Sequence, residues 1–396
     1  MVSHRAAGRL RLGHVWVYRS DVLSTADAPA GSVVHTTDER GKLLGTALHS
    51  STSQIALRLL TRERLASNAE LFALLRRRAA QAVEYRRRLL AQDPGTSACR
   101  VIYSEADGLP GLIVDRYNDV ISLQALTQAM ARPDVQQIIL DEVTSQLNSG
   151  VVSVVERVEP RIRELEQLPA SSNHLLSGSK TATIYALNGL RFHYDALSGQ
   201  KTGAFLDQRE NYAAAEGCAH GRGLDIFCYQ GGFALHLARR CNTVTGVDSA
   251  RPALEVAEQN AALNQREGMP EIEWIEANAF NLLKDYASSG RQYETIVLDP
   301  PAFAKSKRNL PRALAGYKEL NLRALKMLSP GGVLITCSCS QHLSEADFHA
   351  VVTSAAADVG KHVWVVEKRG QAKDHPVLLS VPETAYLKCL ICIVRN

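Results

Sequence analysis

The pattern of apolar and polar residues changes near residue 195. Beyond that point short apolar segments alternate with amphipathic stretches: GLDIF, VTGVD, EIEWIEA, TIVLD and VLITCS are predicted strands, and ALHLARR and ARPALEVAEQNAALN are predicted helices. Strands that alternate with helices predict a parallel sheet with helices on both faces. We therefore expect an α/β fold whose ligands bind beyond the carboxyl ends of the strands.

Before residue 195 the pattern predicts two further parts. Residues 1–65 contain short apolar segments separated by Gly, Asp, Pro and Ser, which is typical of a small β-rich unit, such as a binding module. Residues 66–195 begin with a helical pattern over 68–90 and continue as mixed α/β, with two extended segments around a Gly-Leu-Pro-Gly turn. The predicted domains are therefore 1–65, 66–195 and 196–396.

The helix predicted over 68–90 carries four arginines on one face. Arg76 and Arg87 lie about 20° apart on a helical wheel, as do Arg77 and Arg88. Such a stripe is either a solvated helix face or a contact for nucleic acid, and both interpretations stay open. Residues 1–100 hold 16 Lys and Arg against 8 Asp and Glu, although the whole chain has a net charge of only +4. This excess favours a polyanionic partner for the N-terminal quarter.

The composition is that of an ordinary globular protein. The chain has 396 residues, 45% of them hydrophobic and 22% charged, and it contains no apolar run long enough for a signal peptide or a membrane span. We therefore expect a cytoplasmic protein without a membrane partner. The eight cysteines are scattered, which favours reduced thiols. Cys389 and Cys392 form a CxxC pair within an apolar run, so a buried strand is favoured there and no metal site is expected.

Polar residues stand at the ends of the predicted strands. They are Asp225, Asp248, Asn278, Asp299 and Cys339. The glycine-rich segment after the first strand lacks the GxGxxG that a dinucleotide requires, which disfavours a nicotinamide-dependent oxidoreductase. Two carboxylates on successive strands suit S-adenosyl-L-methionine, since one can face its amino-acid end and the other its ribose hydroxyls. Either Asp alone is more often a helix cap.

The segment LDPPAFAKSK carries a second set of polar groups. Two consecutive prolines fix the backbone and remove two amide donors, so Asp299 and the neighbouring carbonyls can accept hydrogen bonds from a base. Phe303 can stack on an extruded base, and Lys305 and Lys307 can meet phosphate. A rigid turn is the alternative interpretation.

These motifs together resemble a known family. GHVWVYRSDV, SEADGLPGLIVDRY, GQKTGAFLDQREN, LDPPAFAKSK, SCS and DHPVLLSVPETAYLK, in this order, resemble the bacterial 23S rRNA (cytosine-5)-methyltransferases of the RlmI type. The resemblance spans about residues 8–392. It implies an N-terminal PUA-like RNA-binding domain, a central α/β domain and a C-terminal Rossmann-like domain that binds S-adenosyl-L-methionine and methylates ribosomal RNA. A homodimer stays open as the assembly.

The resemblance also implies roles for individual residues. Cys339 would be the nucleophile that adds to cytosine C6, with Asp299 acting at N3, whereas Cys337 would pack in the core. The cofactor would contact Arg209, Asp225, Phe227, Gly231, Phe233, Asp248, Asn278, Ala279, Asp299 and Pro300. From the residues themselves, rather than from the resemblance, the candidates for RNA contacts are Lys201, Phe303, Lys305, Lys307, Arg76, Arg77, Arg87 and Arg88.

The chain departs from the family pattern at two positions, and two other functions stay open. Gln167 stands where the family usually has glycine, and Asn278 stands where an aspartate is common. The first alternative is methylation of a ring nitrogen or exocyclic amine of RNA, which needs no thiol. The second is a non-catalytic RNA-binding protein that assists ribosome assembly.

Overall fold

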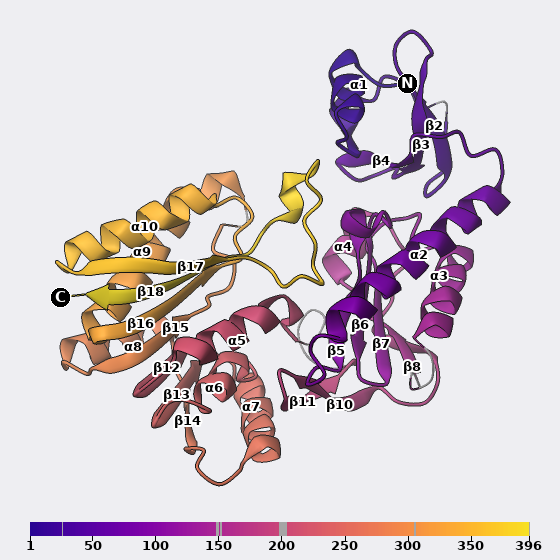
Figure 1. The fold of residues 1–396 in the computed structure, drawn as a ribbon. Helices are drawn as coiled ribbons and strands as arrows, with labels where there is room; N and C mark the ends of the chain where they lie inside the picture. Colours follow the sequence, from indigo (N-terminus) through magenta and orange to yellow (C-terminus); the bar gives the residue numbers. More distant parts are fainter. Residues whose placement is uncertain (26, 148–149, 151–152, 198–203, 305, 396) are drawn as a thin grey trace. The chain divides into compact units, whose positions relative to one another are not determined.

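The computed structural model describes residues 1–396 except 26, 148–149, 151–152, 198–203, 305 and 396. Its internal contacts divide the chain into two units (Figure 1). The first unit comprises Met1–Ala186, Tyr194–Ala204 and Lys373–Thr384. The second comprises Leu187–His193, Phe205–Ala372 and Ala385–Asn396. Within the part of the chain that the structure describes, no helix has the length and apolarity that a membrane crossing requires.

The N-terminal part of the first unit is a four-stranded antiparallel sheet. Its strands are β1 (Trp16–Tyr18), β2 (Val33–Thr37), β3 (Leu43–His49) and β4 (Ile55–Thr61), in the order β1-β4-β3-β2. The β-rich prediction is confirmed, but it missed the helix α1 (His4–Arg11). Ser3 caps this helix by accepting a hydrogen bond from the Ala6 backbone NH. Ala6, Ala7 and Leu10 pack into the core beneath the sheet.

The central part of the first unit is built on a five-stranded sheet in the order β5-β6-β7-β8-β9. The helix α2 (Asn68–Leu90) has the predicted bounds, and its apolar face packs into the core of this part. The other elements of this part are β5 (Ala98–Tyr103), β6 (Leu112–Tyr117), β7 (Val120–Ala125), α3 (Pro133–Gln146), β8 (Ser153–Glu156), α4 (Pro160–Leu165) and β9 (His174–Ser177). A separate two-stranded hairpin of β10 (Ala182–Leu187) and β11 (Leu190–Asp195) follows. Short 3-10 helices cover Arg19–Asp21, Ser104–Asp107 and Pro382–Thr384.

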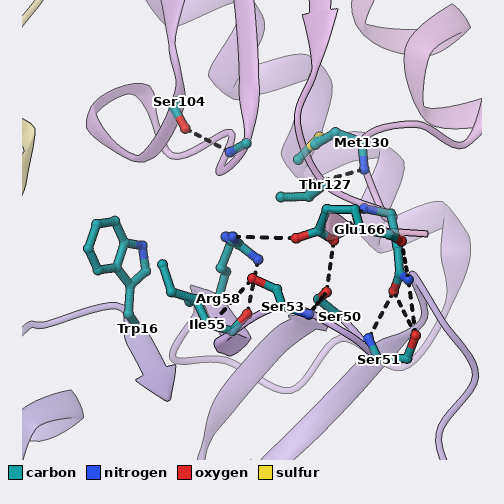
Figure 2. A network of polar contacts seen from close by, with 12 residues as sticks. Trp16, Ser50, Ser51, Ser53, Ile55, Arg58, Ser104, Thr127, Met130 and Glu166 are labelled. Atoms are coloured by element: carbon teal, nitrogen blue, oxygen red, sulfur yellow. Dashed lines mark hydrogen bonds and ion pairs between the residues drawn. The ribbon is translucent and has the colours of Figure 1, made fainter. Parts of the chain in front are cut away.

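A buried polar network joins the N-terminal sheet to the central part (Figure 2). The Arg58 guanidinium lies between two carboxylates, 3.6 Å from Glu105 and 3.9 Å from Glu166. The Trp16 indole NH donates to Glu105 at 2.9 Å, and the Ser50 hydroxyl donates to Glu166 at 2.8 Å. Separating the two parts would leave buried charges without their partners, which is costly. The network therefore holds the N-terminal sheet and the central part together.

A second buried arginine anchors the segment Lys373–Thr384 on the first unit. Arg86 of α2 donates to both carboxylate oxygens of Asp107, at 2.5 and 2.8 Å. It also donates to the backbone carbonyls of Arg100 and Asp374, at 2.9 and 2.8 Å. Arg86 therefore has a structural role, as does Arg78 of the same helix, which donates to the backbone carbonyls of Gly108 and Leu60.

The second unit is a seven-stranded sheet in the order β14-β13-β12-β15-β16-β18-β17. Its strands are β12 (Arg222–Ile226), β13 (Thr243–Asp248), β14 (Ile272–Glu276), β15 (Tyr293–Leu298), β16 (Leu328–Ser338), β17 (His362–Arg369) and β18 (Lys388–Arg395). Its helices are α5 (Arg209–Cys218), α6 (Gly232–Leu237), α7 (Arg251–Asn264), α8 (Ala279–Ser288), α9 (Leu310–Met327) and α10 (Glu345–Asp358). Figure 1 shows α9 and α10 on one face and α5, α6 and α7 on the other.

The expected parallel sheet is confirmed except for one strand. β12 to β16 pair in parallel, but β18 runs antiparallel to both of its neighbours, β16 and β17. β18 follows β17 along the chain without an intervening crossover helix, so it returns beside β17 in the opposite direction. The first residue of β18 therefore lies at the carboxyl ends of the parallel strands.

Candidate active site

The loop that follows β12 is held in an unusual backbone conformation. Phe227 and Tyr229 have φ of 68° and 49°, in the left-handed region that costs a non-glycine residue about 1–2 kcal/mol. The backbone NH groups of Phe227 and Cys228 both donate to the Val247 carbonyl, at 2.9 and 3.0 Å, and so stabilise this shape. At Gly231, with φ of 85°, a side chain would come within 2.8 Å of Trp274. Such strain, kept by its surroundings, is typical of a ligand-binding loop.

Asp225 is a fully buried carboxylate at the start of this loop. One oxygen accepts from the Ala234 backbone NH at 2.8 Å, and the other, Oδ1, has no hydrogen-bond partner among the described residues. Burial, and then the nearby carboxylates of Asp299 and Asp248, raise the pKa of Asp225 well above its usual range. A cationic ligand would offset both the cost of burying the Asp225 charge and its repulsion by the two neighbouring carboxylates. The ammonium and sulfonium groups of S-adenosylmethionine therefore fit this position.

The next two strands add the predicted polar residues beside Asp225. Asp248, at the end of β13, accepts from the backbone NH groups of Tyr229 and Ala250, at 3.0 and 2.9 Å. The Ala277 backbone NH donates to the Asp248 carbonyl at 3.0 Å, so Asn278 lies close to this carboxylate. Asn278 caps α8 by accepting from two backbone NH groups. The structure thus brings Asp225, Asp248 and Asn278 together, and their cofactor contacts stay predictions.

The Asp-Pro-Pro segment and the Ser-Cys-Ser segment meet at the next two strand ends. The Cys339 thiol donates to the Pro300 carbonyl at 3.9 Å. The Ala304 backbone NH donates to the Ser340 hydroxyl at 3.1 Å. The Asp299 backbone NH donates at 3.4 Å to the carbonyl of Ile226, the last residue of β12. The proposed nucleophile, the proposed base-binding residue and the cofactor loop therefore share one edge of the sheet.

Buried hydroxyl groups fix the residues on both sides of Cys339. The Ser338 hydroxyl donates to the Tyr317 hydroxyl at 2.9 Å, and Tyr317 and Ser340 share a hydrogen bond of 3.0 Å. Tyr317, Ser338 and Ser340 are all at most 1% exposed, whereas Cys339 between the serines is half-buried. This arrangement holds a reachable thiol on a rigid support.

Cys337 has the role that was expected of it. It is fully buried in β16, opposite Cys389 of β18. Burial, and then contact with Cys389, raise the pKa of the Cys337 thiol well above its usual range. A buried protonated thiol is a poor nucleophile, so its packing role is confirmed. Cys389 and Cys392 are likewise buried in β18, as predicted.

Two residues beside the site were missed by the sequence analysis. Gln208, in the 3-10 helix Leu206–Gln208, donates from its amide to the Asp299 carboxylate at 2.9 Å. Lys388, the first residue of β18, donates to the Ser340 carbonyl at 2.7 Å. Both lie within quoted motifs, but a polar residue in a loop or at a strand end gives no local signal for such a contact.

The remaining cofactor residues are spread around the same loop. Phe233, in α6, is buried with its ring against Tyr212. Arg209, the first residue of α5, is buried, and its guanidinium lies 3.6 Å from Glu210. Ala279 is the first residue of α8. Their contacts with the cofactor stay predictions.

The predicted RNA-binding residues differ in their surroundings. Phe303 is half-buried, with its ring 4.8 Å from that of Tyr317. Lys307 is exposed at the start of the 3-10 helix Lys307–Asn309. Lys201 and Lys305 lie outside the described residues.

Four of the six arginines of α2, Arg76, Arg77, Arg87 and Arg88, are exposed, as expected for a solvated or RNA-binding face. Arg87 and Arg88, however, each donate to Glu84 at 2.7 Å. These hydrogen bonds lower the pKa of Glu84 to about 2. The carboxylate therefore offsets part of the charge of this pair, whereas Arg76 and Arg77 have no carboxylate partner among the residues that the structure describes.

Comparisons with known proteins agree with this arrangement. Residues 1–62 match the model of a PUA-like domain, and residues 129–392 match that of the S-adenosylmethionine-dependent methyltransferases. The chain is similar over 99% of its length to a crystallised methyltransferase complexed with SAH, with a TM-score of 0.82, 19% identity and 99% coverage of that chain. It is equally similar to a SAM-dependent methyltransferase from Streptococcus mutans, with a TM-score of 0.81, 17% identity and coverage of 99% and 100%. The predicted PUA-like and methyltransferase folds are confirmed, and the cofactor is S-adenosyl-L-methionine.

Two curated relatives carry the name Ribosomal RNA large subunit methyltransferase I. The relative from Photobacterium profundum is 35% identical over 394 residues, which cover 98% of this chain and 96% of the relative. The relative from Pseudoalteromonas translucida is 34% identical over 397 residues, which cover 98% of each. The chain therefore belongs to the S-adenosylmethionine-dependent methyltransferases, in the family of ribosomal RNA large subunit methyltransferase I.

Proposed function

We propose that this protein methylates carbon 5 of a cytosine in 23S ribosomal RNA. The names of its relatives support large-subunit ribosomal RNA as the substrate class. The observation that carries the cytosine chemistry is the position of Cys339, whose half-buried thiol lies 3.9 Å from the Pro300 carbonyl. This position supports a nucleophilic role for Cys339, because the thiol lies beside the Asp-Pro-Pro segment that would hold the base.

A thiol is needed because C5 of cytosine is a weak nucleophile. When the Cys339 thiolate bonds to C6, the C5=C6 double bond is lost and its electron pair makes C5 reactive. S-adenosylmethionine, when bound, supplies the electrophilic methyl group. After methylation a base removes the C5 proton, the C5=C6 double bond reforms, and the C6–S bond breaks to return the thiolate. The thiol is thus a catalyst that is not consumed.

Asp299 would bind N3 of the same ring and so favour the addition at C6. A group that accepts or donates a proton must lie within hydrogen-bond reach of its target and in a fixed orientation. The hydrogen bond from Gln208 fixes the Asp299 carboxylate, and the two following prolines fix its backbone. Gln208 is therefore a positioning residue in this proposal.

RNA would be bound by the N-terminal part of the chain and by residues near the candidate active site. The PUA-like domain and the exposed arginines of α2 would supply contacts to phosphates, which carry much of the affinity of nucleic-acid binding. Phe303 would stack on the extruded base, and Lys201, Lys305 and Lys307 would contact the neighbouring backbone. A homodimer stays a prediction.

The second candidate is methylation of a ring nitrogen or exocyclic amine. It is favoured by the Asp299-Pro300-Pro301 segment, which suits the binding of either kind of base. Methyl transfer from labelled S-adenosylmethionine to unmodified ribosomal RNA, followed by nucleoside analysis, separates the two. We expect label in 5-methylcytidine, whereas label in an N-methylated nucleoside would establish the second candidate.

A further inference from the structure

Lys388 lies beside Cys339 because β18 runs antiparallel to its neighbours. The register of the two strands pairs Lys388 with Ser338, the residue before Cys339. The Lys388 ammonium donates to the carbonyl of Ser340, the residue after Cys339, at 2.7 Å. It also donates to the Tyr386 carbonyl at 2.8 Å. The ammonium is therefore fixed to the short segment that presents the thiol.

The surroundings of Lys388 are costly for a cation. Burial lowers the pKa of Lys388 to about 8, and the neighbouring Cys339 opposes this shift. The two carbonyls use two of the three N–H donors that an ammonium carries. The ammonium of this half-buried lysine is thus held by the Ser340 and Tyr386 carbonyls, and the pKa of about 8 leaves it mostly charged at neutral pH.

Other titratable groups also face Cys339. Tyr317 of α9 is buried, which raises its pKa and keeps its hydroxyl neutral. Asp299 precedes Pro300, whose carbonyl accepts from the thiol, so its negative charge opposes a thiolate. Cys337, two residues earlier in the chain, is buried in the core, and burial raises the pKa of its thiol and keeps it protonated. Against these groups, the Lys388 ammonium supplies the positive charge that favours a thiolate.

We propose that Lys388 is a positioning residue that stabilises the thiolate of Cys339 and holds the Ser340 carbonyl in place. This inference rests on the proposed function, in which Cys339 is the nucleophile. Only the thiolate adds to cytosine C6, so the fraction of thiolate at neutral pH limits the reaction. An opposite charge within about 4–6 Å lowers a pKa by about 1–3 units. The Lys388 ammonium is hydrogen-bonded to the residue that follows Cys339.

A second lysine offers a matched control. Lys361 is also partly buried, its pKa is likewise lowered by burial, and its ammonium donates to the carbonyls of Leu325 and Leu328, at 2.6 and 2.5 Å. Leu328 begins β16, whereas Cys339 follows the last residue of that strand. Lys361→Met therefore removes the same kind of contacts at the opposite end of the sheet.

The test is the pH profile of alkylation of Cys339 in the full-length protein without RNA. Iodoacetamide modification of the Cys339 peptide would be measured by mass spectrometry for the wild type, Lys388→Met, Lys388→Arg and Lys361→Met. We expect the midpoint of the alkylation profile to rise by about one pH unit in Lys388→Met, which is a tenfold loss of thiolate at pH values below the midpoint. In Lys388→Arg and Lys361→Met the midpoint should stay within a few tenths of a pH unit of the wild-type value. Coinciding profiles for Lys388→Met and the wild type, or an equal shift in Lys361→Met, would overturn the inference.

A second measurement separates this inference from the proposed function. If the wild type forms 5-methylcytidine but Lys388→Met keeps the wild-type alkylation profile, only the inference about Lys388 fails. If wild-type Cys339 never bonds to RNA, the proposed function fails whatever the profile shows. Accumulation of a methylated protein–RNA adduct by Lys388→Met, with an unchanged profile, would also overturn the inference, because it would assign Lys388 to removal of the C5 proton.

Discussion

The Cys339 thiol donates to the Pro300 carbonyl at 3.9 Å, although 39 residues separate them in the chain. This contact joins the proposed nucleophile to the segment proposed to bind the base. Cys339→Ala is expected to lower methyl transfer at least about 10³-fold, because the covalent route is lost, while the affinity for S-adenosylmethionine changes less than about twofold. Labelled methyl transfer and calorimetric titration would measure the two effects.

The neighbouring cysteine provides the control for this change. Cys337→Ala removes a buried thiol of similar size but not the nucleophile, so it is expected to cost about 1 kcal/mol of stability and to leave turnover within a few-fold of the wild type. Equal loss of turnover in both variants would contradict the assignment of Cys339.

Asp225 links cofactor binding to stability. Its pKa is raised in the folded protein, so its contribution to stability is present at low pH and is lost as pH rises through the folded pKa. Asp225→Asn keeps an acceptor for the Ala234 NH but removes the buried charge. We expect the cofactor-free variant to unfold at a higher temperature than the wild type at pH 8, with a smaller difference at pH 5, as measured by calorimetry.

The same variant should bind S-adenosylmethionine about 10–100-fold more weakly, because a charged hydrogen bond to the ligand is lost. Calorimetric titration at pH 8 would measure this loss. A variant that is less stable at pH 8 but binds as tightly as the wild type would contradict a role for Asp225 in holding the cofactor.

The backbone conformation at Gln167 explains why the family usually has glycine at this position. Its φ is 50°, in the left-handed region where glycine is favoured. Gln167→Gly should therefore raise the free energy of unfolding by roughly 0.5–1 kcal/mol, measured by urea denaturation.

Asn118→Gly is the matched control for this change, because Asn118 has φ of 52° and asparagine tolerates this region better than glutamine. We expect a smaller gain there. A loss of stability in Gln167→Gly, or an equal gain in Asn118→Gly, would be inconsistent with backbone strain at Gln167.

The arginines of α2 allow a test of RNA binding. Replacing Arg76 and Arg77 together by Ala should weaken binding to a ribosomal RNA fragment. The slope of log K against log salt concentration should also become less steep by about one to two. Glu84→Gln should strengthen binding, because it releases Arg87 and Arg88 from their carboxylate partner. Titrations at several salt concentrations would measure both effects. Unchanged affinity in both variants would show that this face is only solvated.

Local pattern predicted much of the fold. The bounds of α2 and the positions of β12, β13 and β15 follow from apolar periodicity, which a chain segment carries by itself. The helix α1 is only eight residues long, and its short apolar stripe was overlooked among strand signals. The direction of β18 depends on the connection from β17, which no local pattern specifies.

The candidate site was predicted only in part for the same reason. Asp225, Asp248 and Asp299 were found because each follows an apolar strand, and parallel strands bring their carboxyl ends to one edge. Gln208 and Lys388 were missed because their contacts, Asp299 and Ser340, lie 91 and 48 positions away in the chain. The family resemblance assigned Cys337 to the core and Cys339 to the site, and the structure shows a buried and a half-buried thiol at these two positions.

The central claim is that Cys339 bonds to cytosine C6 during methyl transfer. An RNA that carries 5-fluorocytosine at the target position tests it most directly, since fluorine at C5 cannot leave as a proton and the adduct is trapped. We predict that the wild-type protein and S-adenosylmethionine yield a methylated protein–RNA adduct that resists denaturation and maps to Cys339, and that Cys339→Ser yields none. An active wild-type protein that leaves no adduct, or an equal yield from Cys339→Ser, would contradict the claim.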